Sequence, residues 1–270
     1  MLTSERQRMI KEMALQNGEV TISDLAQRFS VSIETVRRDI NILSEKNLLR
    51  KVRGGAVPIQ FPVREDAYDI RYRRNQAGKF AIGEYIAENL IEDNDSIALS
   101  SGSTMEVLAS VITGRNLLIV TNSINIADIL QNRIRQNALS GEVIMLGGVI
   151  RADEHYTGGT IAVEMLKKFT FNKAFLGVSA VSGRDLMASN IEEGIIMSTM
   201  IDHARSCFVA ADASKFDIRS TYTFADLAEI DGIVTEEGAE LSEETYSLLE
   251  ATNVRHFRAP VVTINQAEKA

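Results

Sequence analysis

The chain has 270 residues, of which 45% are hydrophobic and 24% charged, a composition typical of a globular protein that buries a full core. No apolar run approaches the roughly 18 residues that cross a bilayer, and no apolar segment follows the first residues as it would in a secretory signal. A single cysteine, Cys207, excludes an internal disulfide and a cysteine-rich zinc site. We therefore expect a cytoplasmic protein with no membrane association.

The net charge of −8 is unevenly distributed along the chain. Residues 1–57 contain ten Lys or Arg and seven Asp or Glu, a net charge of +3, whereas the remainder contains 19 basic and 30 acidic residues, a net charge of −11. A basic head on an acidic body is expected where only the head meets phosphate.

The first two predicted elements are short helices. Apolar residues recur at helical spacing over residues 6–16, and Gly18 ends that helix. Thr21 or Ser23 can cap a second helix, and Ser30-Val31 then makes a tight turn.

A third helix and a hairpin complete this segment. Ser32 can cap the third helix, and residues 48–57 read as two short strands around Arg53-Gly54-Gly55. The side of the third helix predicted to face inward carries Ile33, Val36, Ile40 and Leu43. The arrangement predicts a small winged helix-turn-helix over residues 1–57.

In a helix-turn-helix the second helix of the pair enters the major groove, where its exposed side chains read base edges. Arginine pairs with guanine through two hydrogen bonds, and cations on a wing contact the phosphate backbone. The predicted DNA-binding residues are Ser32, Glu34, Thr35, Arg37, Arg38 and Asn41 on the helix, with Arg50, Lys51 and Arg53 on the wing. Arg37 and Arg38 alone also fit a solvated helix face, but the whole assembly favours DNA binding.

The same residues carry a family resemblance. Residues 21–40, with their Thr-Val-Arg-Arg-Asp core, and the following Arg-Gly-Gly-Ala wing resemble the DeoR-family signature over nearly all of residues 6–57. The resemblance implies a winged helix-turn-helix that represses sugar-metabolism operons. Asp39 is expected to pair with a neighbouring arginine, since phosphate would repel its carboxylate.

Residues 58–75 are predicted to be a linker, since they contain two of the three prolines and show no clean period. The domain boundary is placed here, and the linker is the natural place for coupling between the domains. From residue 76, apolar runs alternate with helical stretches, which implies a parallel sheet buried on both faces. We expect a Rossmann-like, mainly parallel α/β effector domain over residues 76–264, followed by a frayed tail over residues 265–270.

Four of the predicted strands end in small polar residues and glycine. Ligands of parallel sheets bind at the carboxyl ends of strands, where backbone N–H groups and helix dipoles attract anions. The predicted effector-binding residues are Ser101, Gly102, Ser103 and Thr104; Thr121, Asn122 and Ser123; Gly147, Gly148 and Arg151; and Asp212 and Lys215. Lys215 supplies a charge for phosphate, and Asp212 can accept from sugar hydroxyls. Each cluster alone also fits an ordinary turn or helix cap.

These motifs, in this order, resemble the DeoR-family sensor domain over roughly residues 76–236, which is similar in fold to ribose-5-phosphate isomerase. The resemblance implies a phosphorylated-sugar effector whose phosphate is held by residues 101–104. Two positions depart from the family pattern: Ser100 stands where the family usually has Asp, and no basic residue lies near Met197.

The alternative function is a sugar-phosphate isomerase-like enzyme, which would need a carboxylate base. The run over residues 175–180, where isomerases of this fold carry acids, has none, and the base position falls near Met197. Glu192 and Glu193 lie one turn away, but carboxylates are also favoured at a helix start. We therefore expect binding without turnover and no catalytic residues.

A second alternative is an interaction scaffold whose helix-turn-helix binds protein. The three histidines lack metal-ligand spacing, and the glycine pairs form no dinucleotide fingerprint, so neither a metal nor another cofactor is expected. The predicted partners are double-stranded operator DNA, a phosphorylated sugar, and a second copy of the chain in a homo-oligomer, a dimer or tetramer, since two half-sites require two heads.

Overall fold

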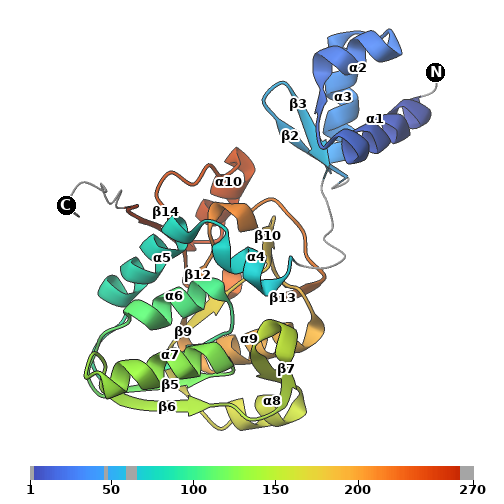
Figure 1. Cartoon of the computed structure of the whole chain (residues 1–270). Helices are drawn as coiled ribbons and strands as arrows, with labels where there is room; N and C mark the ends of the chain where they lie inside the picture. Colours follow the sequence, from blue (N-terminus) through green and yellow to red (C-terminus); the bar gives the residue numbers. More distant parts are fainter. Residues whose placement is uncertain (1–2, 46–47, 59–65, 262–270) are drawn as a thin grey trace, which may run out of the picture. The chain divides into compact units, whose positions relative to one another are not determined.

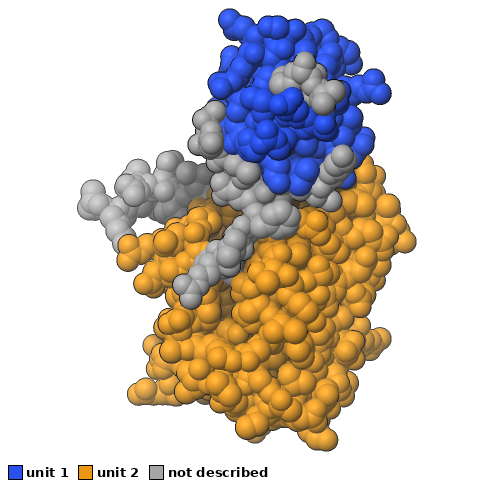
Figure 2. All heavy atoms as spheres, turned by 90° about the vertical axis from the view of Figure 1, so that its right-hand side faces the viewer, with its two compact units in different colours: residues 1–61 blue, residues 62–270 orange. Residues whose placement is uncertain are grey.

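The computed structural model describes residues 3–45, 48–58 and 66–261, and Figure 1 shows their helices and strands. The chain divides into two compact units, Met1–Phe61 and Pro62–Ala270, which Figure 2 distinguishes by colour. The predicted frayed tail and residues 59–65 of the predicted linker lie outside the described residues. No helix of the described residues is long and apolar enough to cross a membrane.

The first unit is a winged helix-turn-helix, as predicted. Its helices are α1 (Thr3–Asn17), α2 (Ile22–Phe29) and α3 (Ile33–Glu45), and its antiparallel sheet has the strand order β1 (Val20–Thr21), β3 (Gly55–Pro58), β2 (Leu49–Val52). Thr21, and not Ser23, caps α2, because its Oγ1 accepts a hydrogen bond from the Asp24 amide at 3.2 Å. Ser32 caps α3 in the same way, accepting from the Thr35 amide at 3.1 Å.

The prediction for the inward face of α3 is wrong at one residue. Val36, Ile40 and Leu43 are buried, but Ile33 is 51% exposed. Ile33 is the first residue of α3, and side chains of a helix tilt toward its N-terminus, so it projects past the packed stripe. Asp39 is buried on this face instead.

The second unit is built on a seven-stranded sheet in which every neighbouring pair is parallel. The order is β15 (Arg255–Ala259), β14 (Gly232–Glu236), β12 (Ala204–Ala210), β9 (Phe171–Gly177), β4 (Ser96–Leu99), β5 (Leu117–Thr121), β6 (Gly141–Met145). The continuous apolar runs form strands because helices cover both faces. The Rossmann-like parallel prediction is confirmed.

Two apolar clusters hold the layers together. One packs α5 (Gln76–Asn89), α6 (Ser103–Val111) and α7 (Ile124–Arg135) on one face of the sheet. The other packs α8 (Thr160–Leu166), α9 (Ile191–Asp202) and α10 (Glu243–Ala251) on the opposite face. Cys207 and Met197 are buried in the second cluster.

Several elements have no counterpart in the sequence prediction. They are the edge strand β15, the hairpin β7 (Val149–Arg151) and β8 (Tyr156–Gly158), and a second, antiparallel sheet of β10 (Ala180–Ser182), β11 (Asp185–Ala188) and β13 (Tyr222–Asp226). Within the predicted linker, Tyr68–Arg73 form helix α4. Its inward side chains Tyr68 and Arg71 make polar contacts, so it leaves no apolar period for the sequence to reveal.

Candidate functional site

The outer face of α3 is a solvent-exposed row of polar side chains. Glu34, Arg37, Arg38 and Asn41 are exposed. Arg37 Nη1 lies 3.6 Å from Glu34 Oε2, an ion pair between two largely exposed groups that contributes little to stability. These side chains are therefore available to a duplex, whereas Thr35 is half-buried and its Oγ1 lies 2.8 Å from Ser32 Oγ.

The wing presents the second group of predicted DNA-binding residues. Arg50 and Lys51 on β2 and Arg53 at the hairpin turn are all exposed. Gly54 has a φ of +87°, a left-handed conformation that favours glycine. At Gly55 a Cβ would lie 2.1 Å from the Val20 carbonyl oxygen, so the close approach of β1 requires the second glycine. The two glycines thus shape the turn that carries the cations.

Asp39 pairs with an arginine, as predicted, but the partner is distant in the sequence. Arg6 Nε on α1 lies 2.5 Å from Asp39 Oδ2, and both side chains are buried. Gln7 Nε2 donates to Asp39 Oδ1 at 3.0 Å. Asp39 therefore fixes α1 against α3 and does not face solvent.

The loop after β4 leads into α6. Gly102 is the N-cap of α6, with a φ of +126° and no atom within 4 Å of a Cβ built on it. Ser101, Ser103 and Thr104 are buried around it. Ser100, the family's usual Asp position, is also buried, and its Oγ accepts from the Gly177 amide at 3.0 Å. The loop thus combines open space beside Gly102 with the free amides of a helix start.

The loop after β5 contains an unpartnered buried acceptor. Ser123 caps α7 by accepting from the Ile126 amide, and Thr121 Oγ1 accepts from the Ser123 amide at 3.1 Å. Asn122 is 1% exposed, and its Nδ2 donates to the Thr157 carbonyl oxygen at 3.3 Å. Its Oδ1 is the one buried side-chain N or O atom of the described residues that lacks a hydrogen-bond partner. Such a group costs free energy unless a ligand or water satisfies it.

The loop after β6 leads into β7, which pairs with β8 next to the loop after β5. Gly147 is exposed with nothing near a built Cβ, and a Cβ on Gly148 would lie 2.4 Å from the Gly158 carbonyl oxygen. Arg151 makes a two-pronged ion pair with Glu192, with Nε 2.7 Å from Oε2. This hydrogen bonding lowers the pKa of Glu192. The predicted effector-binding arginine is therefore already engaged by the start of α9.

Glu193 joins the site, although the sequence prediction placed it only at a helix start. It lies in the first turn of α9, where its amide donates to the Asn190 side chain. Its carboxylate accepts from Ser189 Oγ at 2.9 Å and from Ser101 Oγ at 3.5 Å. Glu193 therefore borders the loop that follows β4.

The fourth cluster, after β12, has its own internal contacts. Asp212 is buried and its Oδ1 accepts from the Ser214 amide at 3.0 Å and from Ser214 Oγ at 2.5 Å. Lys215 is half-buried. Strand β9 separates β12 from β4. Side-chain contacts therefore link the first three clusters, and the fourth cluster lies beside them on the same sheet edge.

Two further buried charges behind this cluster were missed. Glu236 accepts from the Ala213 amide at 3.1 and 3.2 Å, and Lys79 is 2% exposed with Asp212 among the charges that act on it. The sequence nevertheless holds an indication that each of these two charges is buried. Lys79 lies on the inward stripe of α5 with Ile82 and Ile86, and Glu236 ends a strand that begins with an apolar run.

Residues 3–45, 48–58 and 66–261 contain no group of three or more His, Cys, Asp or Glu side chains that could hold a metal ion. Burial raises the pKa of the Cys207 thiol, so its thiolate is disfavoured.

Comparison with known proteins gives the family. The model of the DeoR-like helix-turn-helix domain matches residues 6–60, and that of the DeoR C terminal sensor domain matches residues 74–237. The chain belongs to the DeoR family of transcriptional regulators. It is a regulator and not an enzyme, so the isomerase and scaffold alternatives are not retained.

Three relatives show how much of this DeoR-family regulator the similarity covers. It is 30% identical to the HTH-type transcriptional repressor GlcR of Bacillus subtilis, over 87% of this chain and 89% of the relative. The HTH-type transcriptional regulator GlpR of Haloferax volcanii is 31% identical, with 87% and 91% covered. A lactose phosphotransferase system repressor of Staphylococcus epidermidis is 30% identical, with 84% and 89% covered.

Similar solved structures are more distant. A D-ribose-5-phosphate isomerase in complex with phospho-erythronic acid aligns with 52% of this chain and 54% of its own, at 17% identity and a TM-score of 0.35. The eIF2B delta structure from Chaetomium thermophilum aligns with 62% and 58%, at 14% identity and a TM-score of 0.40. Similarity at this level carries no conclusion about activity.

Proposed function

We propose that this regulator represses a carbohydrate-catabolism operon by binding double-stranded operator DNA in the cytoplasm, under the control of a phosphorylated sugar. The observation that carries the proposal is the exposed face of α3, with Arg37 and Arg38 outward and Val36, Ile40 and Leu43 packed inward. That is the orientation a recognition helix needs in a major groove. The lactose phosphotransferase system repressors among its relatives support a carbohydrate operon.

The DNA-binding residues divide by their contacts. Arg37, Arg38, Asn41 and Glu34 read base edges, with the weak Glu34–Arg37 ion pair opening at little cost. Ser32 and Thr35 at the helix start, and Arg50, Lys51 and Arg53 on the wing, contact phosphate. Because two heads are needed for two half-sites, the functional form is a homo-oligomer with at least two copies.

The effector site lies at the carboxyl edge of the parallel sheet. The phosphate binds at the start of α6, among Ser101, Gly102, Ser103 and Thr104, where free amides and the helix dipole favour an anion. The buried Asn122 Oδ1 accepts from a sugar hydroxyl, which satisfies the orphan acceptor. The remaining contacts come from Thr121, Ser123, Gly147, Gly148, Arg151, Asp212 and Lys215.

The test is binding of the full chain to duplex DNA from upstream of its own gene. Phosphate contacts predict that the logarithm of the affinity falls linearly with the logarithm of salt concentration, and base reading predicts tighter binding to this duplex than to a scrambled one. Addition of glucose 6-phosphate, fructose 6-phosphate or ribose 5-phosphate at constant ionic strength then tests sensing. Equal, salt-independent binding to both duplexes would contradict DNA recognition.

A further inference from the structure

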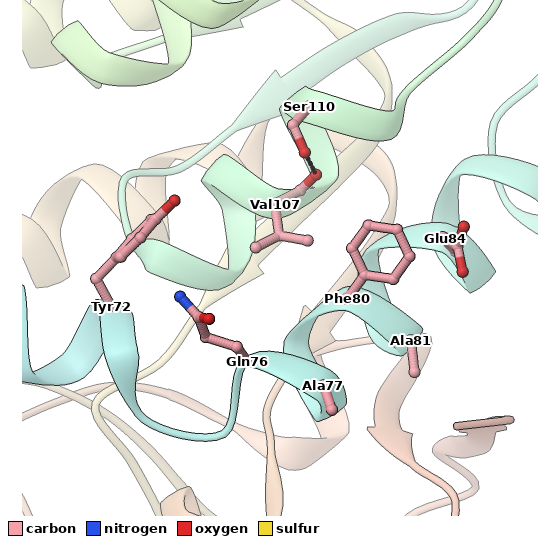
Figure 3. A pocket seen from close by; sticks show the side chains of 8 residues that line it. All are labelled: Tyr72, Gln76, Ala77, Phe80, Ala81, Glu84, Val107 and Ser110. Atoms are coloured by element: carbon pink, nitrogen blue, oxygen red, sulfur yellow. Dashed lines mark hydrogen bonds between the residues drawn. The ribbon is translucent and has the colours of Figure 1, made fainter. Parts of the chain in front are cut away.

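Helix α4 is the first described element of the second unit along the chain, and it begins ten residues after Pro58, the last described residue of the first unit. Its outer side chains have little apolar anchoring, since Ile70 is 53% exposed and Tyr72 is 42% exposed. Tyr72 also lines a groove of about 570 Å³. Figure 3 shows it beside Gln76 and Phe80 of α5 and Val107 of α6, which line the same groove. The position of α4 therefore depends on its inward polar contacts.

One set of contacts joins α4 to the segment that follows Arg151. Arg71 is buried; its Nη2 is paired with the Glu154 carboxylate, and its Nε donates to the Asp66 carbonyl oxygen at 2.9 Å. The Tyr68 ring packs edge-on against His155, with centroids 4.8 Å apart. Glu154 and His155 lie between β7 and β8, three and four residues after the predicted effector-binding Arg151.

The same segment reaches the loop after β5. The His155 carbonyl oxygen accepts from the Ile124 amide at 2.9 Å, and the Asn122 carbonyl oxygen accepts from the Thr157 amide at 2.8 Å. Tyr68 also donates through its hydroxyl to Glu106, a buried carboxylate of α6 that Asn125 of α7 contacts at 3.0 Å. This end of α4 thus touches the elements that carry two of the proposed effector loops.

A second set of contacts joins α4 to the loop after β12. Lys79 Nζ donates to the Arg71 carbonyl oxygen and, at 2.7 Å, to the Arg74 carbonyl oxygen, both at the end of α4. Asn75, which follows α4, donates through Nδ2 to Glu236 Oε1 at 2.7 Å. Glu236 in turn holds the Ala213 amide, next to Asp212.

We propose that α4 carries effector occupancy to the chain segment leading to the DNA-binding unit, and that Arg71 and Lys79 are the positioning residues that connect it to the effector loops. This inference rests on the proposed function. Arg71 contacts the segment after Arg151 through Glu154. Asn75 is connected to the segment after Asp212 through Glu236, and Lys79 is connected to it through the charge of Asp212. A sugar phosphate that shifts either segment changes the hydrogen bonds that place α4.

The first measurement needs no effector: hydrogen–deuterium exchange of the full chain. Arg71→Gln raises exchange in α4 and also over residues 149–157, and Lys79→Met raises it in α4 and over residues 212–216. Arg73→Gln, an exposed position on the same helix, serves as the matched control and leaves both distant segments unchanged. Glu154→Gln removes the other partner of the Arg71–Glu154 ion pair and should raise exchange in the same segments as Arg71→Gln. Variants that loosen α4 alone would overturn the proposal.

The second measurement is coupling, the ratio of operator affinities without and with an equimolar mixture of glucose 6-phosphate, fructose 6-phosphate and ribose 5-phosphate. In the wild type this ratio departs from one by a factor in the allosteric range of about 5 to 150. Arg71→Gln and the milder Tyr68→Phe bring the ratio toward one, while operator affinity without the mixture stays unchanged.

The outcomes separate the two claims. A wild type that shows no response to the mixture contradicts the proposed sensing function, and the role of α4 with it. A wild type that responds, with variants that respond equally well, contradicts the role of α4 alone.

Discussion

The two units present the side chains of their proposed binding sites in opposite ways. In the first unit, Arg38, Asn41 and the wing cations stand in solvent, and Arg37 has only a loose ion pair with Glu34. In the second unit, Arg151 is held by Glu192, and the buried Asp212 holds Ser214. A duplex is a large external partner that exposed side chains can reach, whereas a small ligand needs groups already fixed in place.

The two units also differ in where their buried charged side chains lie. Among the described residues of the first unit, Asp39 is the one buried carboxylate, and its pair with Arg6 holds α1 on α3. The second unit buries Lys79, Arg71, Glu106 and Glu236 near the proposed effector loops. Buried charge is a structural anchor in one region, and in the other it lies where a ligand would act.

The largest expected effect comes from breaking the anchor of the first unit. Asp39→Ala leaves the Arg6 guanidinium buried without its carboxylate, and removing one partner of a buried pair costs about 3–5 kcal/mol. Chemical denaturation of the full chain, followed by operator binding, checks this. A loss below about 1 kcal/mol would mean that the pair behaves like an exposed one.

Asn122→Ala probes the proposed effector site. It removes the orphan acceptor and one hydrogen bond to Thr157, so sugar-phosphate affinity falls by about 1–3 kcal/mol if the acceptor meets a ligand hydroxyl. Isothermal titration with the three sugar phosphates measures this, with Gln131→Ala, an exposed position on α7, as control. Unchanged affinity for a sugar phosphate that binds the wild type would remove Asn122 from the site.

Glu34→Ala is the exposed counterpart of Asp39→Ala on the same helix. The Glu34–Arg37 pair is largely exposed, so its loss changes the free energy of unfolding by about 0–1 kcal/mol. The same denaturation experiment measures it. A loss as large as that of Asp39→Ala would mean that the exposed Glu34 stabilises the fold as much as the buried Asp39 does.

The last expected effect is a pH dependence at Lys79. Burial, opposed by the charge of Asp212 and reinforced by Lys215, Arg71 and Arg74, lowers the pKa of Lys79 to about 8. Between about pH 8 and about 10.4, the usual lysine value, the unfolded state binds more protons, so the contribution of Lys79 to unfolding free energy rises with pH. Subtracting the Lys79→Met profile from the wild-type profile isolates this slope, and a difference that falls with pH would contradict it.

Much of the fold could be predicted because local patterns and packing agree. The strand over residues 96–99 and the helix caps at Thr21 and Ser32 follow from apolar runs and capping chemistry. β15 was missed because Arg255 and Arg258 interrupt its pattern at a sheet edge. α4 was missed because long-range polar pairs hold it.

The site was predictable to a similar extent. Strand ends indicated where the proposed effector loops lie relative to one another, since parallel strands share an edge. The engagement of Arg151 by Glu192, and the approach of Glu193 to Ser101, depend on where α9 begins relative to β4. Contacts between residues about 40 or 90 positions apart leave no local pattern.

The central claim is that α3 reads base edges, and Arg37→Ala and Arg38→Ala test it most directly on operator and random duplexes at one salt concentration. Base reading predicts a loss of about 1–3 kcal/mol on the operator and a smaller loss on random DNA for at least one of the two variants. Arg8→Ala, at an exposed position on α1, should leave both affinities unchanged. Equal losses on the two duplexes for both variants, or no loss on either, would contradict the account.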